Sequence, residues 1–255
     1  IIIFTDAETE FEESFSQIIL QRFQDKKIGV VVGNLQYRED FLAPSQGESL
    51  YWSYEKKLRS LEEECGILSS GTGAAMAIRK KLFTKLRLDE DIDSAVPIVA
   101  NFQGYSVVYA WDAIAFDSAT ASEEQAFNSK VRGASQTITC WLNRLTLRSI
   151  FNYKNIFLSF VMHRLLRYLT FIFIFSTIVS SLLITNSSNY FIFDLSKICS
   201  ILFLTMILFG KLFSYREDSN PLLKTCIAMY YFILSIYGMF IGMIKAFMNR
   251  STKIY

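Results

Sequence analysis

Two acidic residues near the start of the chain have a spacing that can hold a divalent cation. Asp6 and Glu8 are separated by one residue and follow the apolar run 1–4. That run predicts a buried strand, and ligands bind at the carboxyl ends of strands in open α/β sheets. Two carboxylates there can share Mg²⁺ or Mn²⁺, which in turn holds phosphate oxygens. The alternative is a surface helix whose N-terminus the two acids stabilise.

A second group of acids precedes an apolar segment that we expect to be a helix over 94–102. Asp89, Glu90, Asp91 and Asp93 occupy four of five consecutive positions. Acids at a helix start stabilise the helix and need no other role. Their mutual repulsion can also raise the pKa of one carboxyl toward the value that a general base needs.

A glycine-rich turn lies between these two groups of acids in the sequence. Gly71, Thr72 and Gly73 lead into the short apolar segment 74–78. Such a turn lets a ligand approach the backbone closely, and a tight turn without a ligand is the alternative.

A pair of basic residues lies in a segment with a helical pattern, residues 121–147. Lys130 and Arg132 are two positions apart. They are either a clamp for phosphate groups or part of a solvated helix face.

Strands and helices alternate along the part of the chain that must position these residues. The apolar run 28–34 is typical of a strand covered on both faces. A strand, a helix and a strand in this order predict an α/β unit with a parallel sheet. The periodicity predicts helices over 10–24 and 48–64, a loop over 35–47, and strands over 105–110 and 113–116. In the second helix an inward face is expected from Leu50, Tyr54, Leu58 and Leu61.

Apolar residues, 51% of the 255-residue chain, concentrate in its second half. Residues 1–165 mix charged and apolar side chains like a globular domain, whereas apolar residues dominate from Tyr168 onward. This change predicts a soluble part followed by a membrane part. The net charge of +2 gives no indication of nucleic-acid binding, and a single histidine, His163, argues against a histidine-based metal site.

We therefore expect three regions. The first is an α/β domain over 1–135. The second, 136–167, has interfacial amphipathic helices that contact membrane lipids, with basic side chains at the headgroups. The third, 168–255, is a transmembrane region with about three helices, at 168–190, 195–214 and 224–245.

The number of membrane spans affects the predicted topology. Basic residues over 144–167 place the soluble part in the cytoplasm under the positive-inside bias. Three spans would then leave Lys245, Arg250 and Lys253 outside, against that bias, whereas two spans would keep them inside. The middle apolar segment, 198–210, covers only about 20 Å at ~1.5 Å per residue. As a helix this segment would be apolar on every face, which still favours three spans.

Taken in order, these motifs resemble the membrane-bound, processive-type family-two glycosyltransferases, which include cellulose, hyaluronan and poly-N-acetylglucosamine synthases. Residues 4–9 look like the family's DxD strand, 48–55 like the helix after it, and 71–79 like its glycine-rich acceptor-side segment. Asp93 matches the catalytic aspartate, with Asp91 as the alternative. The resemblance runs from residue 1 to about residue 167.

The resemblance implies a partial GT-A fold with a Rossmann-like sheet. Because the chain begins inside a strand, we expect it to be the C-terminal portion of a longer protein, without the N-terminal nucleotide-binding half. The implied activity is inverting transfer of a sugar from a nucleotide-sugar, UDP-linked, to a glycan or lipid-linked acceptor. The implied location is the plasma membrane, with the catalytic domain in the cytoplasm.

The resemblance also assigns roles to individual residues. Asp6 and Glu8 would hold Mg²⁺ or Mn²⁺ on the donor diphosphate, and Lys130 and Arg132 would stabilise that diphosphate. Asp93 would take the proton from the acceptor hydroxyl.

Several positions depart from the family pattern. Glu8 replaces the commoner Asp, Ile92 stands where an acid is usual, and Ser129 and Gly133 replace Gln and Trp. These departures motivate a second hypothesis, a catalytically inactive, membrane-anchored scaffold. A transporter or channel unit is a third and weaker hypothesis, because the expected spans contain no internal acid and base pair.

Overall fold

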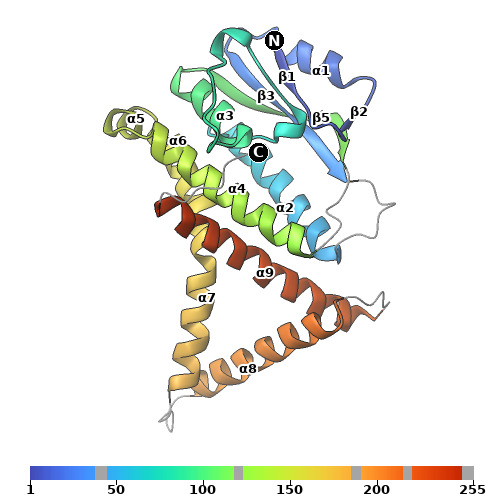
Figure 1. The fold of residues 1–255 in the computed structure, drawn as a ribbon, viewed down its shortest axis with the longest axis vertical. Coiled ribbons are helices and arrows are strands. Elements are labelled where there is room, and N and C mark those ends of the chain that lie inside the picture. Colours follow the sequence, from blue (N-terminus) through green and yellow to red (C-terminus); the bar gives the residue numbers. More distant parts are fainter. Residues whose placement is uncertain (38–44, 118–122, 185–190, 215–219, 249–255) are drawn as a thin grey trace.

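The computed structural model of the chain describes residues 1–37, 45–117, 123–184, 191–214 and 220–248, without the side chains of residues 37 and 45–53. A mixed α/β domain carries a five-stranded sheet, and three long apolar helices follow it in the chain (Figure 1). The prediction of an α/β domain followed by a helical membrane-type region is therefore confirmed.

The sheet is mixed, with the strand order β1-β4-β3-β5-β2. The two strands of the predicted α/β unit, β1 and β3, do not pair, because β4 lies between them and runs antiparallel to both. The parallel pair in this sheet is β3 with β5, and β2 runs antiparallel to β5. β4 has three residues and β2 has two. Strands this short carry no sequence pattern that would predict how they pair in the sheet. The strands are β1 (Ile2–Phe4), β2 (Glu10–Phe11), β3 (Ile28–Tyr37), β4 (Met76–Ile78) and β5 (Ser106–Asp117).

The position of each strand in the sheet decides its burial. Val30, Val31 and Val32 of β3 are fully buried, which confirms a central strand covered on both faces. The prediction of a buried strand over 1–4 is wrong, because β1 lies at the sheet edge and its residues are half-buried.

The helix expected over 10–24 is a short strand followed by a short helix. Glu10 pairs with Phe116 in the sheet, and α1 (Phe15–Arg22) begins only after Ser14. Phe11 stacks on Phe15, with their ring centroids 4.0 Å apart. The spacing of four residues between Phe11 and Phe15 predicted one continuous helix. In the structure the same two rings make contact between the end of a strand and the start of a helix.

Helices cover both faces of the sheet. Phe15 and Ile19 of α1 pack with Val31 on one face. On the other face Val96 and Ala100 of α3 pack with alternate residues of β3. The bounds of α3, Ile92–Phe102, agree with the expected helix over 94–102.

The buried face of α2 (Ser45–Glu64) is not the predicted one. Tyr54 is 60% exposed and Leu61 48% exposed, whereas Glu55, Arg59 and Glu62 are buried. The prediction is wrong because these charged side chains find partners of opposite charge elsewhere in the fold, so their face can be buried.

One continuous helix, α4 (Glu123–Arg144), crosses the expected domain boundary at 135. Ile138, Cys140 and Trp141 of α4 belong to a core cluster that also contains residues of α3 and α9. Residues 136–141 are therefore buried inside the protein, and the prediction of a membrane-surface helix is wrong for them. The short helices α5 (Leu147–Asn152) and α6 (Lys154–Ser159) follow.

Within the described ranges, three helical segments are long and apolar enough to cross a membrane, namely Lys154–Leu183, Phe191–Leu212 and Pro221–Phe247. The first continues from α6 through the π-helix η3 (Phe160–Leu165) into α7 (Leu166–Leu183), and the others are α8 and α9. With its 22 residues, α8 extends beyond the apolar stretch 198–210. Its length of about 33 Å matches the hydrocarbon core of a bilayer.

The last helix, α9, packs along α4 (Figure 1). In its most apolar window 39% of residues are buried, against 11% and 6% in the other two segments. A side chain on Gly242 would collide with the carbonyl oxygen of Val131 and with Ala134, and Gly238 lies against Phe127 and Lys130. The two glycines therefore set the close approach of α9 to α4.

Gly242→Ala is expected to lower the free energy of unfolding by about 1–3 kcal/mol, because an added methyl group overpacks this helix contact. The matched control is Gly133→Ala on α4, where the added methyl group meets nothing within 4 Å. That control should be neutral or stabilising by up to about 1 kcal/mol. Thermal unfolding in detergent measures both, and equal effects of the two substitutions would contradict the packing described.

Candidate functional site

The glycine-rich turn holds the Asp93 carboxylate. The N–H of Gly73 donates a hydrogen bond to Asp93 Oδ1 (2.5 Å), and the N–H of Gly71 donates to the main-chain oxygen of Asp93 (2.7 Å). A Cβ on Gly73 would lie 2.7 Å from that carboxylate oxygen, so the close approach needs a glycine. Two segments predicted to act together are thus in direct contact.

Asp91 lies two residues earlier, at the N-terminus of α3. Its Oδ2 accepts hydrogen bonds from the hydroxyls of Ser94 (3.0 Å) and Thr137 (3.3 Å). Its Oδ1 is buried, and within the described part of the chain it has no hydrogen-bond partner. Burial of one oxygen without a donor disfavours the charged form of Asp91.

The two aspartates differ in how well their charged forms are stabilised. Burial, together with the charge of Asp93, raises the pKa of Asp91 to about 7. Burial also raises the pKa of Asp93, while the Gly73 N–H, Arg59 and Arg164 favour its ionised form. The charged form of Asp93 thus has a hydrogen-bond donor and two nearby cations, whereas Oδ1 of Asp91 has no donor in the described part of the chain.

Asp6 lies close to this pair. Phe4 pairs with Met76 in the sheet, so the residues after β1 lie beside the turn that precedes β4. The charge of Asp6 contributes to the raised pKa of Asp93, which shows that the two carboxylates are within electrostatic range. Glu8, two residues further on, is exposed, as is Asp6.

These acids do not form a complete metal cage. The described residues include no group of three or more His, Cys, Asp or Glu side chains that could hold a metal ion. Mg²⁺ is usually bound by one or two protein carboxylates together with substrate phosphates and water. Asp6 and Glu8, exposed at the end of a strand, fit that second kind of site.

The structure does not bring Lys130 and Arg132 together. Both lie on α4, and residues two positions apart on a helix point about 200° away from each other. Arg132 is exposed, whereas Lys130 is half-buried and lines a cavity with residues of α7 and α9. The pair therefore does not form the phosphate clamp that its spacing suggested.

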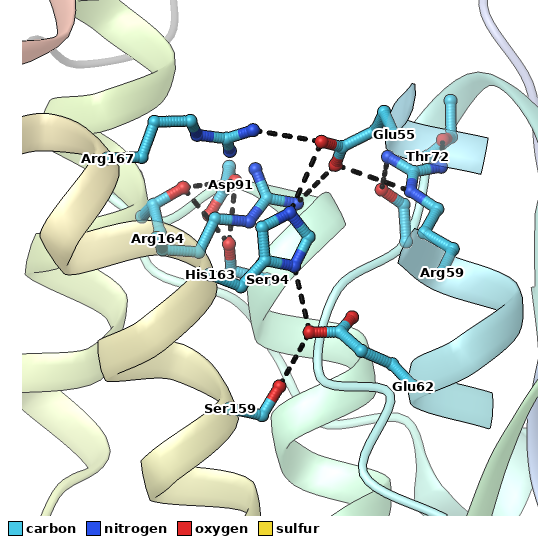
Figure 2. Close-up of polar contacts among 12 residues, drawn as sticks. Glu55, Arg59, Glu62, Thr72, Asp91, Ser94, Ser159, His163, Arg164 and Arg167 are labelled. Carbon is cyan, nitrogen blue, oxygen red and sulfur yellow. Dashed lines mark hydrogen bonds and ion pairs between the residues drawn. The ribbon is translucent and has the colours of Figure 1, made fainter. Parts of the chain in front are cut away.

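A buried cluster of charges beside the aspartates was not predicted (Figure 2). Glu55 is its centre and is 2% exposed. Its Oε2 lies 2.9 Å from Arg167 Nη1 and 3.2 Å from His163 Nε2, and its Oε1 lies 3.5 Å from Arg164 Nη2 and 3.6 Å from Arg59 Nε. Burial would raise the pKa of Glu55, but these cations together hold it well below its ordinary value.

His163 bridges two carboxylates. Its Nδ1 lies 2.8 Å from Glu62 Oε1, and its Nε2 faces Glu55. Each ring nitrogen thus lies within hydrogen-bond distance of a carboxylate oxygen. The Ser159 hydroxyl also donates to Glu62 Oε1, at 2.7 Å. His163 and Arg164 lie in the π-helix η3, a local irregularity that is often found at functional sites.

Arg59 connects this charge cluster to the glycine-rich turn. It donates hydrogen bonds to the Thr72 hydroxyl (2.6 Å) and to the Gly71 carbonyl (3.3 Å). A continuous series of contacts thus runs from α7 through Glu55 and Arg59 to the turn that holds Asp93. The position of the turn depends on the cluster.

The sequence does contain a signal for the cluster. Glu55, Arg59 and Glu62 recur at helical spacing on one face of α2, opposite the apolar residues. The amphipathic period of α2 by itself indicates that this charged face meets solvent, and the basic residues over 144–167, Arg164 and Arg167 among them, indicate contact with lipid headgroups. Complementary charges on two predicted helices are the pattern that could have indicated a buried contact.

A scan against protein-family models finds no match for this chain, and a search of curated proteins finds none either. The fold and the site therefore define the class. The protein is a mixed α/β protein with membrane-type helices and a half-buried aspartate pair next to a cluster of paired charges.

Glu55→Gln is expected to lower the free energy of unfolding by about 3–5 kcal/mol, since it leaves several buried cations without their shared counter-charge. Glu64→Gln makes the same chemical change at an exposed position of the same helix. It should change stability by less than about 0.5 kcal/mol. Thermal unfolding compares the two variants, and similar melting temperatures would contradict the importance of the cluster.

The aspartate pair predicts how stability depends on pH. Because the pKa of Asp91 rises from 3.8 to about 7 on folding, the folded chain binds more protons between these values. Stability should therefore fall as pH rises through this window. Asp91→Asn removes this titration, so its melting temperature should vary less between about pH 5 and 7 than that of the wild type. An unchanged pH dependence in the variant would argue against the raised pKa.

Proposed function

We propose that the chain is part of a membrane-bound, inverting glycosyltransferase that moves a sugar from a nucleotide-sugar to an acceptor hydroxyl. The observation that carries this proposal is the position of Asp93. Its carboxylate is held by the N–H of Gly73 and lies within electrostatic range of Asp6, which follows the edge strand. The resemblance of the motifs at residues 4–9, 71–79 and 93 to family-two glycosyltransferases supports the same reaction.

Asp93 acts as the general base in this proposal. The ionised carboxylate takes the proton from the acceptor hydroxyl as that oxygen attacks the anomeric carbon of the donor. The bond from that carbon to the leaving diphosphate breaks on the opposite face, so the configuration inverts. Arg59 and Arg164 favour the ionised form of Asp93 before the acceptor binds.

Asp6 and Glu8 would hold Mg²⁺ or Mn²⁺, which when bound supplies positive charge next to the leaving diphosphate. Gly71, Thr72 and Gly73 would form the acceptor side of the site. The Arg59 contacts to Thr72 and Gly71 would keep that side in place. We assign no diphosphate role to Lys130 and Arg132 as a pair, because they face different sides of α4.

The surroundings suggest where the reaction takes place. The charge cluster joins this site to Arg167 at the start of α7, the first of the long apolar helices. A glycan or a lipid-linked acceptor would therefore meet the site close to a membrane surface. We propose the cytoplasmic face of the plasma membrane, with a UDP-linked sugar as the donor.

Asp93→Asn tests the proposal in the full-length protein that contains this chain. Transfer from a nucleotide-sugar should fall by more than about a hundredfold, because loss of a general base typically costs about 10²–10⁴ in rate. Asp89→Asn, in the same acidic segment but paired with Arg87 outside the site, serves as the control and should retain activity. A melting temperature close to the wild-type value establishes that Asp93→Asn is folded. Near wild-type transfer by that folded variant would remove Asp93 from the mechanism.

The separation of Lys130 and Arg132 favours a second candidate function, a catalytically inactive scaffold that is anchored to the membrane. Such a protein would keep the fold and the charge cluster without binding a donor. Full-length protein that binds none of a panel of nucleotide-sugars in the presence of Mg²⁺ or Mn²⁺ would support the scaffold over the enzyme.

A further inference from the structure

A cavity of about 200 Å³ lies where α2, α4, α7 and α9 meet. Apolar residues of α9 form much of its wall, among them Ala228, Phe232 and Ile236. Lys130 from α4 and Arg167 from α7 line it as well. The cavity thus has a mostly apolar wall, and two basic residues are among those that line it.

The cavity lies at the boundary between two parts of the molecule. The α4 helix packs on α3 in the α/β domain, whereas α7 and α9 belong to segments long and apolar enough to cross a membrane. Phe232 in the cavity wall is 50% exposed, so the cavity adjoins the apolar outer surface of α9. Lipid headgroups meet acyl chains at this kind of boundary.

The charge of the cavity favours an anion. Among the described residues that line the cavity, Lys130 and Arg167 are charged, and none carries a carboxylate. Arg167 also contacts Glu55 Oε2 at 2.9 Å, which fixes the direction of its guanidinium. With five N–H donors, a guanidinium can bind a carboxylate and a phosphate at the same time.

We propose that this cavity binds an anionic phospholipid of the surrounding bilayer. The lipid phosphate lies between Lys130 and Arg167, and an acyl chain lies along Ala228, Phe232 and Ile236. Because Arg167 also pairs with Glu55, the bound phosphate lies next to the charge cluster. It thereby stabilises the contact between the α/β domain and α7. This site does not depend on the transfer reaction and would be present in an enzyme or in a scaffold.

Lipid binding to the purified, delipidated chain in detergent tests the proposal. Phosphatidylglycerol should bind saturably, with one molecule per chain, and raise the melting temperature by mass action. Phosphatidylcholine, which carries no net charge, should bind at least about tenfold more weakly, a difference of ~1.4 kcal/mol. Native mass spectrometry gives the stoichiometry, and a titration followed by melting temperature gives the affinity.

Two variants and a control locate the site. Lys130→Gln should weaken phosphatidylglycerol binding about tenfold, a difference of ~1.4 kcal/mol. Arg132→Gln removes the same charge from the exposed side of the same helix and should leave binding unchanged. Ala228→Phe fills the cavity without changing any charge and should also weaken binding. The melting temperature of each lipid-free variant shows whether it is folded.

Three results would overturn the proposal. Equal weakening by Lys130→Gln and Arg132→Gln would indicate general attraction to a basic surface. Equal binding of the two phospholipids would remove the role of the anionic headgroup. Displacement of phosphatidylglycerol by an equimolar polyprenyl phosphate would identify the cavity as the place of a lipid-linked substrate and not of a bilayer lipid.

Discussion

The structure depends on the burial of one carboxylate, that of Glu55. A buried charge is costly unless it is paired and hydrogen-bonded. Glu55 meets this condition through Arg59 on its own helix and through His163, Arg164 and Arg167. The hydrogen bonds to His163 and Arg167 join residues 108 and 112 positions apart in the chain. The α/β domain and the first long apolar helix therefore cannot separate without leaving buried charges unpaired.

The same charge cluster sets the geometry of the candidate site. Arg59, held beside Glu55, contacts the side chain of Thr72 and the carbonyl of Gly71. The turn that contains them donates the N–H of Gly73 to Asp93. The charge state of the aspartate pair also depends on the cluster, since Arg164 lowers the pKa of both members. A change at the membrane end of the cluster would thus reach the proposed catalytic base.

Local patterns in the sequence predicted the elements that local forces determine. The continuous apolar run in β3 indicated its burial on both faces, and the acids before α3 marked the start of that helix. The glycine-rich turn predicted a close approach of a ligand to the backbone or a tight turn alone, and in the structure the Asp93 carboxylate approaches Gly73. These features could be predicted because a few adjacent residues decide them.

The features that were not predicted depend on partners distant in the chain. Tyr54 and Leu61 are exposed because α2 buries its charged face against residues of η3 and α7. The amphipathic period alone assigns such a face to water. For α2 a tertiary contact thus overrides the local pattern. The spacing of Lys130 and Arg132 on a predicted helix already places them on different faces, but it could not show that Lys130 would lie against α9 and that Arg132 would be exposed.

A double-mutant cycle between Glu55 and Arg167 tests most directly whether this ion pair joins the domain to α7. The free energy of unfolding is measured for the wild type, Glu55→Gln, Arg167→Gln and the double variant. We predict that the double variant loses less stability than the sum of the single losses, with a coupling energy of at least about 1 kcal/mol. Losses that add to within about 0.5 kcal/mol would contradict a direct interaction and the account built on it.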